Sequence, residues 1–333
     1  MWEAGRETRT EMPAVRKVGY LALLIGFVQV VFGAVVRISG SGLGCGDHWP
    51  DCFGAFTPTS KTPSLLVEIS HRYGAAALSV AIIALALIAF RQRDAKGVAG
   101  RGGALRPALL AVLLVIVAAL FGAVTVKMEL NPIVVVTHLA IAMSLLAVLV
   151  VVVVRAGGFG ATRIPARYPR TFRSARAAVG LTFLALVLGA LTANTPGAPH
   201  ACLGFPWCRT ASGTGTPFWI QVTHRIIAFL LLGHLTGIFF AARRRGESTI
   251  IRRATSAALG IMLLQIVIAA AMVELNLPPG LRSLHQAVGT SLWICVVALA
   301  ALASGFHGLT EIERIVYESP SRGEFATPEG VST

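Results

Sequence analysis

Four histidines occupy related positions in the chain, each close to the beginning of a long apolar run. The segments EISHR and QVTHR contain His71 and His224, and two later runs contain His138 and His285. Polar side chains in a membrane are costly and usually functional. The recurrence of imidazole at such places therefore indicates a functional site, whereas a single histidine there would indicate only a hydrogen-bonded packing residue.

Paired imidazoles are metal ligands. Iron, copper and zinc all accept imidazole nitrogen, but a zinc site needs a third and a fourth ligand nearby, and neither pair has them. Two histidines that face each other on neighbouring helices are sufficient for a heme iron. We therefore predict two bis-histidine heme sites, His71 with His138 and His224 with His285, and copper remains an alternative metal.

One of the two histidine segments carries an acid. Glu68 precedes His71 by three residues, so both lie on the same face of a helix, where a carboxylate beside a heme iron can move protons or stabilise developing positive charge. The alternative is a structural ion pair with Arg72. The second segment has Gln221 instead. We predict chemistry at the first site and electron transfer at the second, with Glu68 catalytic. We expect Arg72 and Arg225 to bind heme propionates or to extend to the membrane interface.

The elements that position these residues are membrane-spanning helices. Of the 333 residues, 55% are hydrophobic and only 13% are charged, which is too apolar for a soluble protein. Continuous apolar runs of about 20 residues must be helical to satisfy their backbone in lipid. The fold class expected is an all-α polytopic membrane protein with eight transmembrane helices, at 18–36, 69–90, 107–126, 132–154, 175–193, 217–242, 254–273 and 281–306.

The basic residues lie on one side of these spans. The net charge of +14 would suggest nucleic-acid binding in a soluble protein, but 22 of the 29 basic residues fall before the first span, after the last, or in 91–106, 155–176 and 243–253. By the positive-inside rule both termini are cytoplasmic in a plasma membrane. The loops 37–68 and 194–216 then face outward, and no nucleic acid is expected as a partner.

Four of the five cysteines form close pairs in the two outward loops. Cys45 and Cys52 lie in CGDHWPDC, and Cys202 and Cys208 lie in CLGFPWC. Disulfides persist outside the cytoplasm, whereas two cysteines per loop fall short of a four-ligand zinc site. We predict the disulfides Cys45–Cys52 and Cys202–Cys208, with Cys295 as a packed apolar side chain.

The sequence contains an internal repeat of about half its length. FGAVVRISGSGLGCGDHWPDC and EISHR match LGALTANTPGAPHACLGFPWC and QVTHR, and FGAVTVKMELNPIVVVTHLAIA matches IAAAMVELNLPPGLRSLHQAVG. Each half has four helices, so the repeat is parallel, and each of the four histidines is expected within the first two turns of its helix. The predicted parts are a cytoplasmic N-terminal tail 1–17, a half 18–154 with the substrate site, a basic linker 155–174, a half 175–306 with the cofactor site, and a cytoplasmic tail 307–333.

These motifs resemble the heme A synthase family, in its bacterial form with two cysteine pairs. GAVVRISGSGLGCGDHWPDC, EISHR, the later histidines and CLGFPWC occur in the family's order, and the resemblance covers residues 18–306. It implies oxidation of the C8 methyl group of heme O to a formyl group, giving heme A for terminal oxidases.

The same resemblance implies the residue roles. His71 and His138 would face heme O, and His224 and His285 would hold heme b as cofactor. Glu68 matches the family's essential acid. The first cysteine pair matches a functionally important disulfide and the second a more structural one. The farnesyl tail of heme O implies an opening to lipid, and the implied partners are heme O synthase and terminal oxidase assembly.

Two other functions remain open at this point. A diheme electron carrier of the cytochrome b kind would exchange electrons with quinone and would not need Glu68. A heme transporter would need a nucleotide-binding or ion-coupling motif, and the chain contains no G-x-x-x-x-G-K-[ST] segment.

Overall fold

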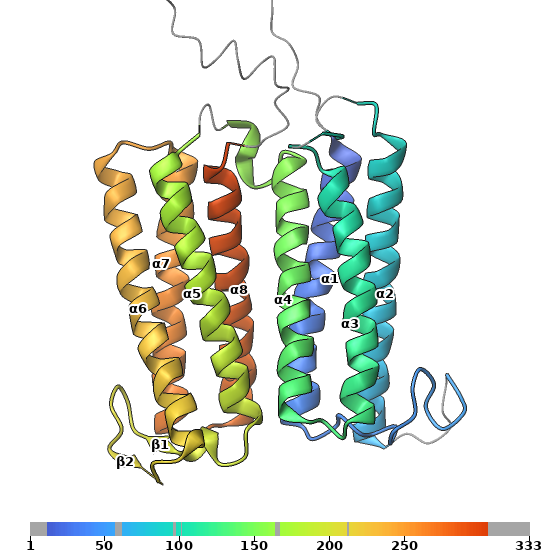
Figure 1. The fold of residues 1–333 in the computed structure, drawn as a ribbon, viewed down its shortest axis with the longest axis vertical. Helices are drawn as coiled ribbons and strands as arrows, with labels where there is room; N and C mark the ends of the chain where they lie inside the picture. Colours follow the sequence, from blue (N-terminus) through green and yellow to red (C-terminus); the bar gives the residue numbers. More distant parts are fainter. Residues whose placement is uncertain are drawn as a thin grey trace, which may run out of the picture.

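The computed structural model describes residues 12–56, 62–95, 98–100, 102–163, 167–211 and 213–305 (Figure 1). The predicted tail 307–333 lies outside the described residues. So do residues 1–11 of the predicted tail 1–17, residues 164–166 of the predicted linker and the last residue of the predicted span 281–306.

Within these residues, eight helices are long and apolar enough to cross a membrane. The predicted all-α polytopic fold is confirmed. The helices are α1 (Pro13–Ile38), α2 (Pro63–Arg91), α3 (Leu105–Lys127), α4 (Pro132–Arg155), α5 (Pro169–Asn194), α6 (Thr216–Arg244), α7 (Thr249–Glu274) and α8 (Pro279–Ala303). Short elements lie between them: the 3-10 helices η1 (Gly158–Arg163) and η2 (Ala198–His200), and the antiparallel strands β1 (Cys202–Leu203) and β2 (Thr210–Ala211).

Several helices begin earlier than their apolar runs. Proline in the first helical turn starts α2 at Pro63, whereas the apolar run predicts residue 69, because proline has no N–H to leave unsatisfied there. His71 therefore lies eight residues into α2, about 12 Å from its start, and His224 lies equally deep in α6. The expectation of the first two turns is wrong for these two residues, which lie in the third turn.

The helices form two four-helix groups that stand side by side (Figure 1). Helices α1–α4 make one group and α5–α8 the other, and α1, α4, α5 and α8 form the contact between them. Trp293 of α8 is buried there and donates its indole N–H to the carbonyl oxygen of Met143 in α4 at 2.8 Å. Because α8 packs on both groups, it is the most buried of the membrane helices.

The two groups repeat one backbone path. The turn from α3 to α4 has left-handed residues at Glu129 and Leu130, and the turn from α7 to α8 has them at Asn276 and Leu277. The loops after α1 and α5 lie at one end of the bundle, opposite the start of α1 (Figure 1). We call this end the loop end. The even-numbered helices therefore all start at the loop end, which places their histidines at similar depths.

Candidate functional site

A large cavity lies within the first helix group. It has a volume of about 570 Å³ and is lined mainly by apolar side chains from α1, α2, α3 and α4. The polar side chains at its surface include Glu68, His71, His138, Gln29 and Arg37. The structure therefore brings the first predicted histidine pair and the predicted acid to one cavity, which we call the first cavity.

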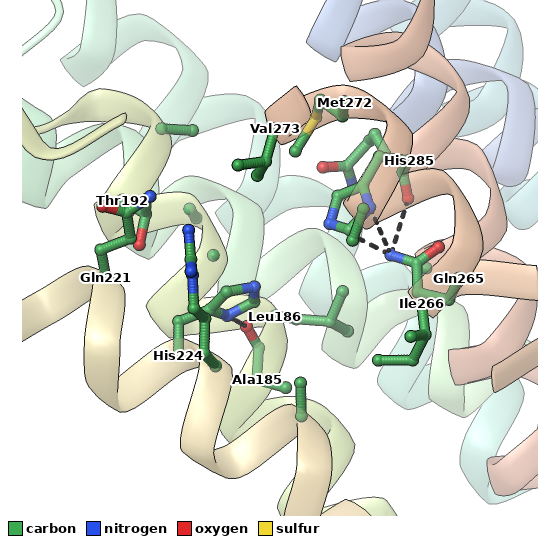
Figure 2. A pocket seen from close by; sticks show the side chains of 18 of the residues that line it. Ala185, Leu186, Thr192, Gln221, His224, Gln265, Ile266, Met272, Val273 and His285 are labelled. Atoms are coloured by element: carbon green, nitrogen blue, oxygen red, sulfur yellow. Dashed lines mark hydrogen bonds between the residues drawn. The ribbon is translucent and has the colours of Figure 1, made fainter. Parts of the chain in front are cut away.

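A smaller cavity occupies the corresponding place in the second group. Its volume is about 200 Å³, and it is lined by His224 of α6, His285 of α8, Gln221 and Gln265. Figure 2 shows the two imidazoles on opposite sides of this second cavity, carried by different helices. Both predicted histidine pairs are thus gathered as the repeat predicts, one pair per cavity.

Small residues on the odd-numbered helices leave room for the imidazoles. A Cβ atom added to Gly33, Gly122 or Gly189 would lie 3.2, 3.4 or 3.0 Å from the Cε1 atom of His71, His138 or His224, respectively. The residue that matches Gly122 in the second half is Ala269, which also lines the second cavity. The rings of His71, His138 and His224 therefore each pack against a glycine of a neighbouring helix, where a larger side chain would displace them.

Hydrogen bonds orient three of the rings. The amide nitrogen of Gln29 lies 3.0 Å from Nδ1 of His71 and donates to the carbonyl oxygen of His71 at 2.8 Å. Gln265 makes the same two contacts with His285, each at 3.1 Å (Figure 2). Nδ1 of His224 instead donates to the carbonyl oxygen of Ala185 at 3.0 Å, which leaves Nε2 available to a ligand. An amide can turn either its nitrogen or its oxygen toward Nδ1, so the glutamines accommodate either tautomer.

Two buried amide oxygens at the second cavity have no hydrogen-bond partner among the described residues. They are Oε1 of Gln221 and Oε1 of Gln265. A buried polar atom without a hydrogen bond costs about 1–3 kcal/mol, so such atoms in a native cavity point to a bound group. Among the described residues there is no group of three or more His, Cys, Asp and Glu side chains that could hold a bare metal ion. Two imidazoles per cavity fit an iron that a porphyrin already holds.

Glu68 lies between the first cavity and the loop that carries Cys45 and Cys52, at the loop end of the bundle. Its side chain is only 5% exposed, pairs with Arg72, and accepts the backbone N–H of Cys45 at 2.8 Å. The equivalent Gln221 donates to the carbonyl oxygen of Pro199 at 3.3 Å. The first cavity therefore has an ionisable group where the second has an amide.

Arg72 and Arg225 bind the loops rather than pointing freely into the cavities. Arg72 donates to the carbonyl oxygens of His48, Pro50 and Asp51. Arg225 donates to the carbonyl oxygens of Cys202, Gly204 and Pro206. In both halves, an arginine near the start of the even-numbered helix therefore holds the cysteine loop through hydrogen bonds to its backbone.

The four loop cysteines pair as disulfides. The Cα atoms of Cys45 and Cys52 are 5.0 Å apart, and those of Cys202 and Cys208 are 5.1 Å apart, both within the usual range for a disulfide. Cys52 also lines the first cavity. Cys295 is half-buried in α8, where its thiol contacts the carbonyl oxygen of Ala254.

Ion pairs of opposite orientation attach each loop to an odd-numbered helix. Lys127 at the end of α3 lies 3.4 Å from Asp47, and this cation lowers the pKa of the Asp47 carboxyl below its ordinary value. In the second half, Glu274 at the equivalent place pairs with Arg209 and accepts the backbone N–H of Phe205 at 2.9 Å. The contact is repeated with its charges exchanged.

Reasoning from the sequence missed four residues at these cavities. Gln29 and Gln265 are polar residues within apolar runs, a signal that could have identified them. Arg37 and Arg282 line the cavities as well. Because both lie at the ends of spans, where arginine is common, sequence alone gives them no distinguishing mark.

These features define an eight-helix membrane protein built from a duplicated four-helix unit, with a histidine-paired cavity in each copy. The chain belongs to the COX15-CtaA family of cytochrome oxidase assembly proteins, whose profile matches residues 16–297. The resemblance to heme A synthases stated from the motifs is confirmed.

Curated relatives agree with this family. A heme A synthase from Geobacillus thermodenitrificans is 29% identical over 272 residues, which cover 78% of this chain and 81% of the relative. One from Lysinibacillus sphaericus is 25% identical over 316 residues, covering 87% and 94%. A protoheme IX farnesyltransferase from Thermus thermophilus is 30% identical over 305 residues, covering 86% of this chain but only 48% of that protein.

Proposed function

We propose that the chain is a heme A synthase, an oxidoreductase that converts the C8 methyl group of heme O to a formyl group. The observation that carries this proposal is the buried carboxylate of Glu68 beside a histidine-paired cavity, in one half of the molecule only. A carrier of electrons would need the histidine pairs but has no use for an acid at one of them.

In this proposal the first cavity receives the substrate. Heme O carries a farnesyl tail and needs more room than heme b, which agrees with the larger volume of the first cavity. His71 and His138 would hold the porphyrin and so position its methyl edge. Oxidation of the methyl to a formyl group, by two hydroxylations with oxygen from water and loss of one water, releases four protons and four electrons, which the heme of the second cavity would pass one at a time to an external one-electron acceptor. Glu68 accepts protons from the reacting carbon or from water beside it.

The second cavity holds heme b, with His224 and His285 as the iron ligands. When bound, this heme supplies one-electron transfer. The chain's own residues fix the ligand geometry: Ala185 orients the ring of His224, and Gln265 contacts the ring of His285. Gln221 keeps the second site free of a second acid, which suits a site that transfers electrons.

The cysteine loops cover both sites in this proposal. Arg72 and Arg225 hold the loops through backbone carbonyls, so propionate binding by these two arginines would require those bonds to open. The basic ends of the helices and both termini lie in the cytoplasm, and the loop end faces outward from the plasma membrane. The half 18–154 is then the substrate half, and the half 175–306 the cofactor half.

The natural partner is the enzyme that makes heme O. A protoheme IX farnesyltransferase matches this chain over about half of the farnesyltransferase's length. This match supports a close association between the farnesylation and the oxidation of heme. The family description, cytochrome oxidase assembly protein, supports delivery of the product to a terminal oxidase.

Pigment analysis tests the proposal. The full-length protein is produced with and without a heme O synthase, and the hemes are extracted from the purified protein and membranes. Heme A in the presence of the synthase is the expected result. Heme B alone, with heme O supplied and unconverted, would contradict the proposal and favour the diheme electron carrier.

A further inference from the structure

The two cavities share a wall. Arg37, Gly189, Ala190, Ala193 and Gln286 line both of them. These residues come from the loop-end turns of α1, α5 and α8, which lie in the contact between the two helix groups. These residues therefore border both cavities near the loop end, and a side chain in the wall can reach a group on either side.

Arg37 is the cation in this wall. Its guanidinium donates one hydrogen bond across the contact, to the carbonyl oxygen of Ala193 at 3.3 Å. Arg282, which lines the second cavity, is close enough to repel it electrostatically. Across the described part of the chain, neither arginine has a carboxylate within ion-pair distance. Two half-buried cations thus lie near each other without an anion.

Such an arrangement is unfavourable until an anion completes it. Two like charges in a poorly solvated wall repel each other, and each guanidinium retains several N–H donors that match a carboxylate. We propose that Arg37 and Arg282 form a carboxylate-binding pair that receives the propionate groups of the bound porphyrins, with Arg37 available to both cavities. This inference rests on the proposed function for the identity of the ligand, and the pair itself rests on the geometry of the wall.

The positions along the helices agree with this assignment. Arg282 precedes His285 by three residues on one face of α8, which places it about 4.5 Å nearer the loop end. Arg37 follows Gly33, which contacts the ring of His71, by four residues, or about 6 Å in the same direction. A porphyrin held at the depth of the histidines with its propionates toward the loop end would bring them to the level of both cations.

The Arg37–Arg282 pair exists only because the two halves pack against each other. In the repeat, Arg37 of the first half aligns with Ala193 of the second, and Arg282 of the second half aligns with Val135 of the first. Each half therefore contributes one cation, and the equivalent residue in the other half is uncharged. A positive charge beside a heme favours its reduced form. Arg37 and Arg282 would therefore raise the reduction potential of the heme in the second cavity.

Redox titration of the purified full-length protein with heme b bound tests this role. Arg37→Gln and Arg282→Gln each shift the ratio of reduced to oxidised heme about tenfold toward oxidised at a fixed potential, which is a decrease of about 59 mV for one electron. The matched control is Arg252→Gln, which removes an exposed arginine of α7 near the opposite end of the bundle and leaves the potential unchanged. Potentials unchanged in both cavity variants would overturn the inference.

A second measurement separates propionates from an inorganic anion. The chain is produced in heme-deficient cells and loaded with protoheme or with its dimethyl ester, whose propionates are capped. Wild-type protein prefers the free acid, and this preference falls at least tenfold in Arg282→Gln. An equal preference in both proteins means that the pair holds an inorganic anion or nothing, and contradicts the assignment.

Two further outcomes keep the conclusions separate. If the Gln variants lose heme altogether, Arg37→Lys and Arg282→Lys retain it because they keep the charge, whereas equal loss in the Lys and Gln variants contradicts the inference. If the potentials shift as expected but no heme A is formed with heme O supplied, the carboxylate pair stands and the proposed reaction fails.

Discussion

Glu68→Gln is the substitution that separates catalysis from structure at the first cavity. The amide keeps the shape of the carboxylate but loses its charge, so the contacts with Cys45 and Arg72 become weaker. Hydrogen bonds to charged groups contribute about 1.5–3 kcal/mol and neutral ones about 0.5–1.5 kcal/mol, so we expect a loss of about 1–2 kcal/mol of stability. Arg72 retains its three loop carbonyl acceptors, so it is not left buried and unpaired.

The catalytic effect should be much larger than this structural effect. Proton transfer by a positioned side chain contributes about 10²- to 10⁴-fold in rate, which corresponds to about 3–5 kcal/mol of activation free energy. We therefore expect heme A formation in Glu68→Gln to fall at least 100-fold while the protein still accumulates in the membrane with heme b. The assay is quantitative heme extraction from cells that also produce heme O synthase, normalised to the amount of purified protein.

Glu274→Gln is the matched control. Glu274 also binds a loop arginine and a loop backbone N–H, but it is 41% exposed and lines neither cavity. This variant should form heme A at close to the normal rate. Normal heme A formation by Glu68→Gln, or an equal loss in both variants, would refute the catalytic role and leave Glu68 as part of the loop attachment only.

Two other perturbations have outcomes fixed by the structure. Gly189→Leu should displace the ring of His224, since even a Cβ atom there would lie 3.0 Å from Cε1; the b-type absorption spectrum should be lost, whereas Gly180→Leu on the same helix, where a Cβ atom meets no neighbour within 4 Å, should retain it. The Asp47–Lys127 ion pair depresses the pKa of Asp47 below its ordinary value of 3.8, so its contribution is present above about pH 4 and disappears as the pH falls through the lower folded-state value. Hydrogen-exchange protection factors of the first cysteine loop, which correct for the intrinsic pH dependence of exchange, should fall over that acidic range in wild-type protein and stay constant in Asp47→Asn; identical pH dependence of the protection factors in the two proteins would show that the pair does not hold the loop.

The sequence predicts the helices well because lipid permits few alternatives. A continuous apolar run must satisfy its backbone within one helix, so the eight spans follow from composition. Their starts do not, because α2 continues toward the loop end through the segment PSLLVE, as far as Pro63. The start of this extension depends on proline chemistry and on contacts with the cysteine loop.

The candidate site was predictable where the repeat made it visible. His71 and His224 recur at matching places, and the departure of Gln221 from Glu68 marks the asymmetry between the halves. The partners of the rings were less accessible, since Gln29 binds His71 through its side chain and the matching Ala185 binds His224 through its backbone. A backbone acceptor leaves no trace in residue type, so only the structure reveals that equivalence.

The shared wall could not be predicted because it depends on how the two halves meet. Arg37 faces the second half, where its guanidinium donates a hydrogen bond to the carbonyl oxygen of Ala193, the residue at its own repeated position. Sequence periodicity specifies which face of a helix is polar, but it does not specify which helix of another bundle that face meets.

We propose that the paired imidazoles of His224 and His285 hold a heme iron in the second cavity. Absorption spectra of the purified protein test it most directly, with His224→Ala and His285→Ala compared with His234→Ala. His234 lies on the same helix as His224 but lines neither cavity and bonds to the carbonyl oxygen of Ser174. We expect a low-spin b-type spectrum in the wild-type protein and in His234→Ala, and its loss in each of the other two variants. Retention of that spectrum in either His224→Ala or His285→Ala would rule out this histidine pair as the iron ligands.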